Sequence, residues 1–132
     1  MKKFNNVYVI DDDKIFHFII NKLLAKNDIN ANLSFFHNGL DALDEIKENL
    51  TSDHLLPDLI LLDINMPILD GWQFLEEYQQ IKEQFNIQPD IYLISSSDNV
   101  MDTDKAKEFS DVIKNYLLKP VNNQDIESIF AN

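Results

Sequence analysis

The sequence contains no cysteine among its 132 residues. A disulfide framework and thiol chemistry are therefore excluded, and any activity must rest on other side chains. No apolar run approaches the ~20 residues that a transmembrane helix needs. The first six residues, MKKFNN, lack the long apolar stretch of a signal peptide. We therefore expect a cytoplasmic protein without membrane insertion.

Basic side chains are also scarce, with 11 lysines and arginines against 23 aspartates and glutamates and a formal net charge of −12 at pH 7. Binding to nucleic acid usually needs a basic surface, and anionic membranes attract positive charge. The charge therefore disfavours both as direct partners. The hydrophobic share of 45% supports a globular core, and the length predicts a single domain over residues 1–132 with no output domain.

Apolar runs alternate with helical patterns along the chain. The runs at 7–10, 59–62, 91–94 and 112–118 are typical of buried strands, and 31–36 of a shorter one. Apolar residues three and four positions apart mark three helices, and segments 99–109 and 124–130 predict a weak fourth helix and a short fifth one. The marking residues are Ile15, Phe18, Ile19, Leu23; Leu40, Leu43, Ile46, Leu50; and Phe74, Leu75, Tyr78, Ile81, Phe85. This alternation predicts a doubly wound α/β fold with five strands and five helices.

Two of the predicted strands end in carboxylates. Asp11, Asp12 and Asp13 follow the run at 7–10, and Asp63 follows the run at 59–62. If the two strands are neighbours in a parallel sheet, these carboxylates meet at one rim, where ligands bind in such sheets. Two like charges ~4 Å apart repel by about 4 kcal/mol at an effective dielectric near 20. An all-oxygen site of this kind suits a hard divalent ion, most plausibly magnesium (Mg2+).

The simpler interpretation of the first acidic cluster is helix capping, because aspartate favours N-caps and first turns. We expect it to hold for Asp13. It does not explain Asp63, which is followed by Asn65 and Pro67 rather than by an immediate helical pattern.

Two further strand ends carry polar residues. The run at 91–94 leads into Ser95, and the run at 112–118 leads into Lys119 and Pro120. Each signal is weak alone, since serine is common in turns and a lone lysine is usually a surface charge. Four predicted strands end, in chain order, in Asp11-Asp12, Asp63, Ser95 and Lys119. Taken together, these four ends are a strong signal of one shared site.

At this point the chain resembles the receiver domain of two-component response regulators, of the stand-alone, CheY-like type. The resemblance covers residues 5–132 and implies a flavodoxin-like fold with sheet order 2-1-3-4-5. The matching motifs are Val9-Ile10-Asp11-Asp12-Asp13, Leu62-Asp63-Ile64-Asn65-Met66-Pro67, Asp70-Gly71, Ile94-Ser95-Ser96 and Tyr116-Leu117-Leu118-Lys119-Pro120.

The resemblance implies a role for each residue of the acidic rim. Asp63 matches the phosphoacceptor, which takes a phosphoryl group from a phosphohistidine of a sensor histidine kinase or a histidine phosphotransfer protein. Asp11 and Asp12 match the acidic pair that holds Mg2+. Asn65 matches the position that lends a backbone carbonyl to the metal.

The resemblance also implies a switch. Ser95 matches the switch hydroxyl, Lys119 the lysine that contacts the phosphoryl group, and Tyr116 the switch aromatic. Phosphorylation then changes the face formed by the fourth helix, fifth strand and fifth helix, which a downstream protein binds. Asn65 and Ser97 flank the path of the hydrolytic water, so we expect them to tune the lifetime of the phosphorylated state as the domain slowly dephosphorylates itself.

Some residues depart from the common family pattern. Ser96 is bulkier than the alanine or glycine often found there, which predicts slower exchange with small phosphodonors. Val121 stands where an aromatic residue is common, and the loop at 51–57 is longer than in the shortest receivers. None of these changes removes a functional atom.

Two other classes of function were weighed against the switch. A phosphatase with an aspartate nucleophile needs a second carboxylate at the position of Asn65, so turnover of external substrates is not expected and the chain is not predicted to be an enzyme. A phosphorylation-independent scaffold with the receiver fold is the remaining alternative, although such proteins usually lose an acidic residue or the lysine.

His17, His37 and His54 are interpreted as surface or half-buried residues, and Trp72 as a packing anchor.

Overall fold

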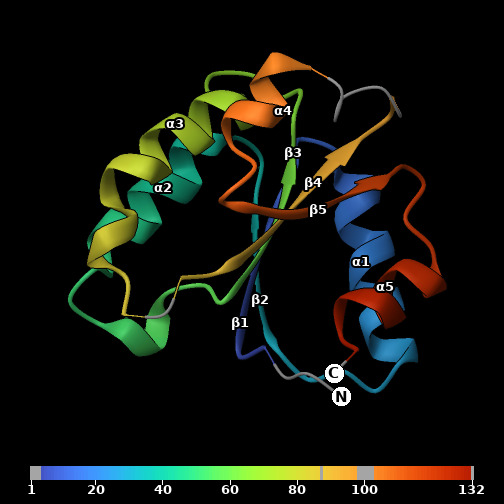
Figure 1. Cartoon of the computed structure of the whole chain (residues 1–132). Coiled ribbons are helices and arrows are strands. Elements are labelled where there is room, and N and C mark those ends of the chain that lie inside the picture. The colour runs from blue at the N-terminus through green and yellow to red at the C-terminus, as the bar shows by residue number, and fades with distance from the viewer. Residues whose placement is uncertain (1–3, 87, 98–102, 132) are drawn as a thin grey trace.

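The structure is a computed structural model that describes residues 4–86, 88–97 and 103–131. Its centre is a parallel sheet of five strands in the order β2-β1-β3-β4-β5 (Figure 1). The strands are β1 (Asn6–Ile10), β2 (Asn32–Phe36), β3 (Leu59–Asp63), β4 (Asp90–Ser95) and β5 (Ile113–Leu118). The predicted flavodoxin-like sheet, with its order, is confirmed.

The described residues also form five α-helices, of which the first four connect successive strands and the fifth follows β5. They are α1 (Lys14–Lys26), α2 (Gly39–Glu48), α3 (Gly71–Ile81), α4 (Asp104–Glu108) and α5 (Asn123–Ile129). Short 3₁₀ helices lie at Asp53–Leu55 and Lys82–Gln84. The predicted fourth helix began at position 99, and its first four positions lie outside the described residues. No helix in the described part of the chain is both long enough and apolar enough to cross a membrane.

The sheet is covered on both faces, with α1 and α5 on one side and α2 and α3 on the other (Figure 1). Successive residues of a strand point to opposite faces, so each central strand feeds two cores. Tyr8 and Ile10 of β1 belong to the cluster that includes α2 and α3, whereas Val7 and Val9 belong to the cluster that includes α1 and α5. Burial on both faces explains why β3 reads as one continuous apolar run.

The first helix, α1, forms as predicted. Its buried face, however, differs from the one predicted from the apolar spacing. Ile15 and Phe18 are 69% and 60% exposed. The side chains that enter the core are Phe16, His17, Ile20 and Leu24. Both sets have helical spacing, so the periodicity alone did not select the face. The interpretation of His17 as a surface or half-buried residue was therefore wrong, since this side chain is only 9% exposed.

The loop after β3 is held tightly against the strand by a glycine. A Cβ atom at Gly71 would lie 2.6 Å from the carbonyl oxygen of Asp63, so only glycine fits where α3 begins. The N–H of Gly71 donates to the carbonyl oxygen of Ile64 at 2.9 Å. Asp70 caps α3 through a reciprocal pair of hydrogen bonds with Gln73. These contacts fix the end of β3 and therefore the backbone of Asp63.

Candidate functional site

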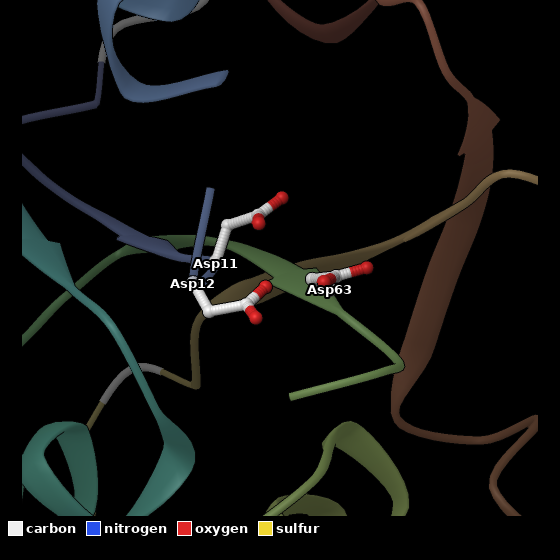
Figure 2. A group of neighbouring side chains, drawn as sticks. All are labelled: Asp11, Asp12 and Asp63. Atoms are coloured by element: carbon white, nitrogen blue, oxygen red, sulfur yellow. The ribbon is translucent and has the colours of Figure 1, made fainter. Parts of the chain in front are cut away.

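The carboxyl ends of β1 and β3 bring three carboxylates together, as the sequence predicted. Ile10 pairs with Leu62, so Asp11 and Asp63 follow at the same level on adjacent parallel strands. Figure 2 shows Asp11 and Asp12 at the end of β1 beside Asp63 at the end of β3. One carboxylate oxygen from each residue lies within 4.8 Å of the others.

The carboxylate of Asp63 is destabilised by its surroundings. Its side chain is buried, and burial raises the pKa of Asp63 to about 7, with the charges of Asp11 and then Asp12 adding to the rise. The charge of Lys119 and the backbone N–H of Asn65 oppose the shift without cancelling it. The ionised form of Asp63 is therefore disfavoured in this cluster, and an added cation would favour it.

Lys119 supplies the positive charge inside the cluster. Its Nζ atom lies 2.8 Å from Oδ2 of Asp11 and 3.8 Å from Oδ1 of Asp63. Oδ2 of Asp11 is buried, and its short contact with the ammonium group of Lys119 is the ion pair that offsets its charge. Burial alone would lower the pKa of Lys119, but the contact with Asp11 and the charge of Asp63 outweigh it and raise that pKa. The lysine therefore stays charged.

Ser95 ends β4 beside this cluster, with its hydroxyl engaged in its own loop. Its Oγ atom donates to the carbonyl oxygen of Ser97 at 3.0 Å and accepts from the N–H of Ser97 at 3.0 Å. Its backbone carbonyl accepts from the N–H of Lys119 at 2.9 Å. The predicted convergence of the ends of β4 and β5 is thus present, and the side chain of Ser95 is buried.

The remaining predicted residues lie around the rim. Asn65 and Ser97 are exposed on the loops after β3 and β4. Tyr116 is half-buried on β5 and packs against the core cluster that includes α2 and α3.

Asp13 caps α1, because its Oδ1 atom accepts from the N–H of Ile15 at 2.9 Å, as expected. Trp72 stacks on Phe109 with ring centroids 6.1 Å apart, which confirms it as a packing residue.

Two residues beside the site were not predicted from the sequence. The ring of Phe16 lies under the ammonium group of Lys119, with Nζ 5.1 Å from the ring centroid. His17 lies against the rings of Phe35 and His37, at 4.9 and 5.0 Å between centroids, and burial lowers its pKa. The four-residue spacing of Phe16, Ile20 and Leu24 was the available signal.

The donor set of the cluster fits a hard divalent cation. All candidate ligand atoms are carboxylate oxygens, which Mg2+ prefers. The three carboxylates of the cluster outnumber the ammonium group of Lys119, which leaves an excess of negative charge when all three are ionised. An ion at this position would remove that excess.

Comparison with known proteins agrees with this geometry. Residues 7–131 match the family described as the response regulator receiver domain. Among curated proteins, the chain is 28% identical over 128 residues to hybrid signal transduction histidine kinase L of Dictyostelium discoideum, covering 97% of this chain but only 7% of that protein. It is 31% identical over 83 residues to the chemotaxis protein CheY of Bacillus subtilis, covering 63% of each.

A solved structure shows the same fold. The two component response regulator from Cytophaga hutchinsonii superposes with a TM-score of 0.83 and 27% identity, covering 98% of this chain and 96% of that one. Receiver domains interact with histidine kinases and phosphotransfer proteins and bind Mg2+ at an acidic cluster such as that of Asp11, Asp12 and Asp63. The chain belongs to the response regulator receiver domain family of two-component signalling.

Proposed function

We propose that this chain is a phosphoaccepting signalling switch in which Asp63 takes a phosphoryl group from a phosphohistidine. The donor is a sensor histidine kinase or a histidine phosphotransfer protein. The observation that carries the proposal is the position of Asp63 at the end of β3, within a three-carboxylate cluster and 3.8 Å from Lys119. A carboxylate with a strongly perturbed pKa at the carboxyl-end rim of a parallel sheet is a candidate functional group.

The transfer needs positioning and charge neutralisation more than covalent help from the protein. A carboxylate oxygen of Asp63 attacks phosphorus, an O–P bond forms, the P–N bond breaks, and the imidazole of the donor leaves. Lys119 neutralises charge on the phosphoryl oxygens, as a point charge on a flexible stem. Asp11 keeps that ammonium group at the site through the 2.8 Å ion pair.

The carboxylates of Asp11, Asp12 and Asp63, with the backbone carbonyl of Asn65, are proposed to hold Mg2+. The ion supplies positive charge that offsets the carboxylates and the incoming phosphoryl oxygens. Burial of Asp11 and Asp63 keeps their orientation fixed, whereas the exposed Asp12 leaves one side of the cluster open to solvent. The site is thus able to admit a donor on that side.

Switching requires that Ser95 exchange its partners. Its hydroxyl bonds Ser97 in this structure, and turning toward a phosphoryl oxygen on Asp63 would break both contacts. Tyr116 then moves into the space that the Ser95 side chain leaves, which alters the face formed by α4, β5 and α5. Shifting a population from 1:99 to 99:1 takes about 5.5 kcal/mol, which a few charge-assisted hydrogen bonds at about 1.5–3 kcal/mol each can supply.

The switch resets by hydrolysis of the acyl phosphate on Asp63, and it turns over no external substrate. Asn65 and Ser97 are exposed on the two loops that border the cluster, which supports their assignment as residues that tune the lifetime. The 132 residues act as one receiver unit. Its output partner is a protein, because the net charge of −12 disfavours nucleic acid.

Phosphate uptake tests the proposal. The wild type, incubated with Mg2+ and either a phosphorylated histidine kinase or a small acyl-phosphate donor, should gain one phosphate by intact mass. Asp63→Asn should gain none from either donor, because an amide is not a competent nucleophile. Asp58→Asn, at the other end of β3, is the matched control and should react like the wild type. Equal yields on the wild type and Asp63→Asn would refute the assignment, and no adduct on the wild type would favour the scaffold.

A further inference from the structure

We propose that Phe16 is a positioning residue for phosphoryl transfer, whose ring holds the ammonium group of Lys119 beside the acidic cluster. The catalytic meaning of this role rests on the proposed function. Nζ of Lys119 lies 5.1 Å from the ring centroid. This distance is within the ~6 Å over which a cation is attracted by the negative face of an aromatic ring.

Three groups neighbour the ammonium group of Lys119. Nζ contacts Asp11 Oδ2 at 2.8 Å and approaches Asp63 Oδ1 at 3.8 Å, and the ring of Phe16 lies on a further side. A carboxylate in place of the ring would form a second strong ion pair and draw the lysine away from the phosphoryl group. An aromatic face attracts the charge without fixing any single N–H. Lys119 therefore remains free to turn toward a phosphoryl oxygen on Asp63.

The ring itself is fixed by the core. Phe16 is 3% exposed and belongs to the same buried cluster as Leu117 and Val121, which flank Lys119 along the chain. Its position relative to the backbone of Lys119 is thus set by packing between α1 and the end of β5. A buried ring in this position excludes water from one side of the ammonium group, and cation–π attraction strengthens where the cation is desolvated.

The segment that carries Phe16 also carries the carboxylate that pairs with Lys119. The N–H of Asp13 donates to Oδ1 of Asp11 at 2.9 Å, and the N–H of Phe16 donates to the carbonyl oxygen of Asp13 at 3.1 Å. These bonds tie the first turn of α1 to Asp11. The anion and the ring that hold the ammonium group are therefore kept in one relative position by a single turn of chain.

The test replaces Phe16 with phenylalanine analogues carrying one, two or five fluorine atoms, introduced by site-specific incorporation. Fluorine withdraws charge from the ring face and weakens cation–π attraction in steps, with little change in ring size. The rate of phosphate uptake at saturating Mg2+ should fall steadily along the series, reaching about three- to tenfold for the pentafluoro ring. Phe16→Leu should lie at the slow end of the same range.

The same series at Phe74 is the matched control, because Phe74 is equally buried but lies in the cluster on the opposite face of the sheet. Its fluorinated variants should take up phosphate at the wild-type rate. If Phe16 had only a structural role, fluorination at Phe16 and at Phe74 would change the unfolding midpoint alike. The rate of phosphate uptake would then not fall step by step along the Phe16 series. A wild-type rate for pentafluoro-Phe16 would overturn the proposal.

A second measurement separates this inference from the proposed function. The ring of Phe16 should shift the NMR signals of the ε-methylene protons of Lys119 upfield in the protein without any donor, and Phe16→Leu should abolish that shift. If the wild type takes up no phosphate while the shift is present, the proposed function fails and the contact stands. If the shift is absent, Phe16 does not hold Lys119 and the inference is wrong.

Discussion

Two aspartates lie at opposite ends of β3 and have opposite surroundings. Asp58, directly before the strand, accepts hydrogen bonds from the backbone N–H groups of Asn5 and Asn6 at 2.8 and 3.0 Å. Asp63, the last residue of the strand, is buried beside Asp11 and has its pKa raised to about 7. The same side chain is thus satisfied at one end of the strand and crowded by like charge at the other.

The difference separates a carboxylate with a structural role from one for which we propose a function. Asp58 joins the start of β3 to the chain entering β1 and stabilises the sheet through neutral donors. We expect Asp63 to lower the stability of the protein without a bound cation, because its ionised form is buried near two other acids. A strongly perturbed carboxylate of this kind is a candidate functional group, which agrees with the proposed role of Asp63.

Neutralising each aspartate in turn should change the free energy of unfolding in opposite directions. Without Mg2+ at pH 8, Asp63→Asn should raise the free energy of unfolding by about 2–4 kcal/mol, because a pKa shift from 3.8 to about 7 corresponds to about 4 kcal/mol. Asp58→Asn should lower it by about 1–2 kcal/mol, since the amide keeps only one acceptor. Urea denaturation of the three proteins gives the values.

The pH dependence provides the control. The folded-state pKa of Asp63 lies above its unfolded value, so the stability linked to this group is complete below about pH 4 and is lost as pH rises through about 7. The wild type and Asp58→Asn should show that loss, and Asp63→Asn should not. Destabilisation by Asp63→Asn at pH 8 would mean that the carboxylate is satisfied in the folded protein.

The next test extends the comparison to the hydroxyl beside Asp63. Ser95→Ala should still take up phosphate but should lose about 1.5–3 kcal/mol of bias toward the active state, a roughly ten- to hundredfold change in population. Lys119→Ala should impair both uptake and switching, because it removes a charge that both need. The measurement is the NMR environment of the Tyr116 ring with and without a beryllofluoride phosphoryl mimic. Full switching by Ser95→Ala would assign the coupling to the backbone.

Replacing Asp12, the exposed member of the cluster, should change the stability least. Asp12→Ala should weaken Mg2+ binding by at least about tenfold, since it removes one charge near the ion. Without metal it should raise stability by less than about 1 kcal/mol, because solvent screens an exposed carboxylate. Trp72 fluorescence or calorimetry follows the titration. Wild-type Mg2+ affinity in this variant would exclude Asp12 from the metal site.

The sequence was sufficient for the sheet and for the members of the rim. Buried strands of a parallel sheet are continuous apolar runs, and the residue after each run lies at the carboxyl rim, so Asp63, Ser95 and Lys119 followed directly. The buried face of α1 did not follow, because apolar residues occur all around that helix. Phe16 and His17 were missed for this reason. The bond from Ser95 to Ser97 depends on a side-chain rotation that no pattern encodes.

Our account holds that Asp63 lies in a carboxylate cluster that needs a cation. The pKa of the Asp63 side chain tests this directly. Asp63 is observed through its ¹³Cγ signal in NMR titrations, assigned with Asp63→Asn, with and without saturating Mg2+. We predict a pKa near 7 without metal and a value below the range of the titration with metal, because the ion favours the ionised form. A value near 4 in both conditions would contradict the account.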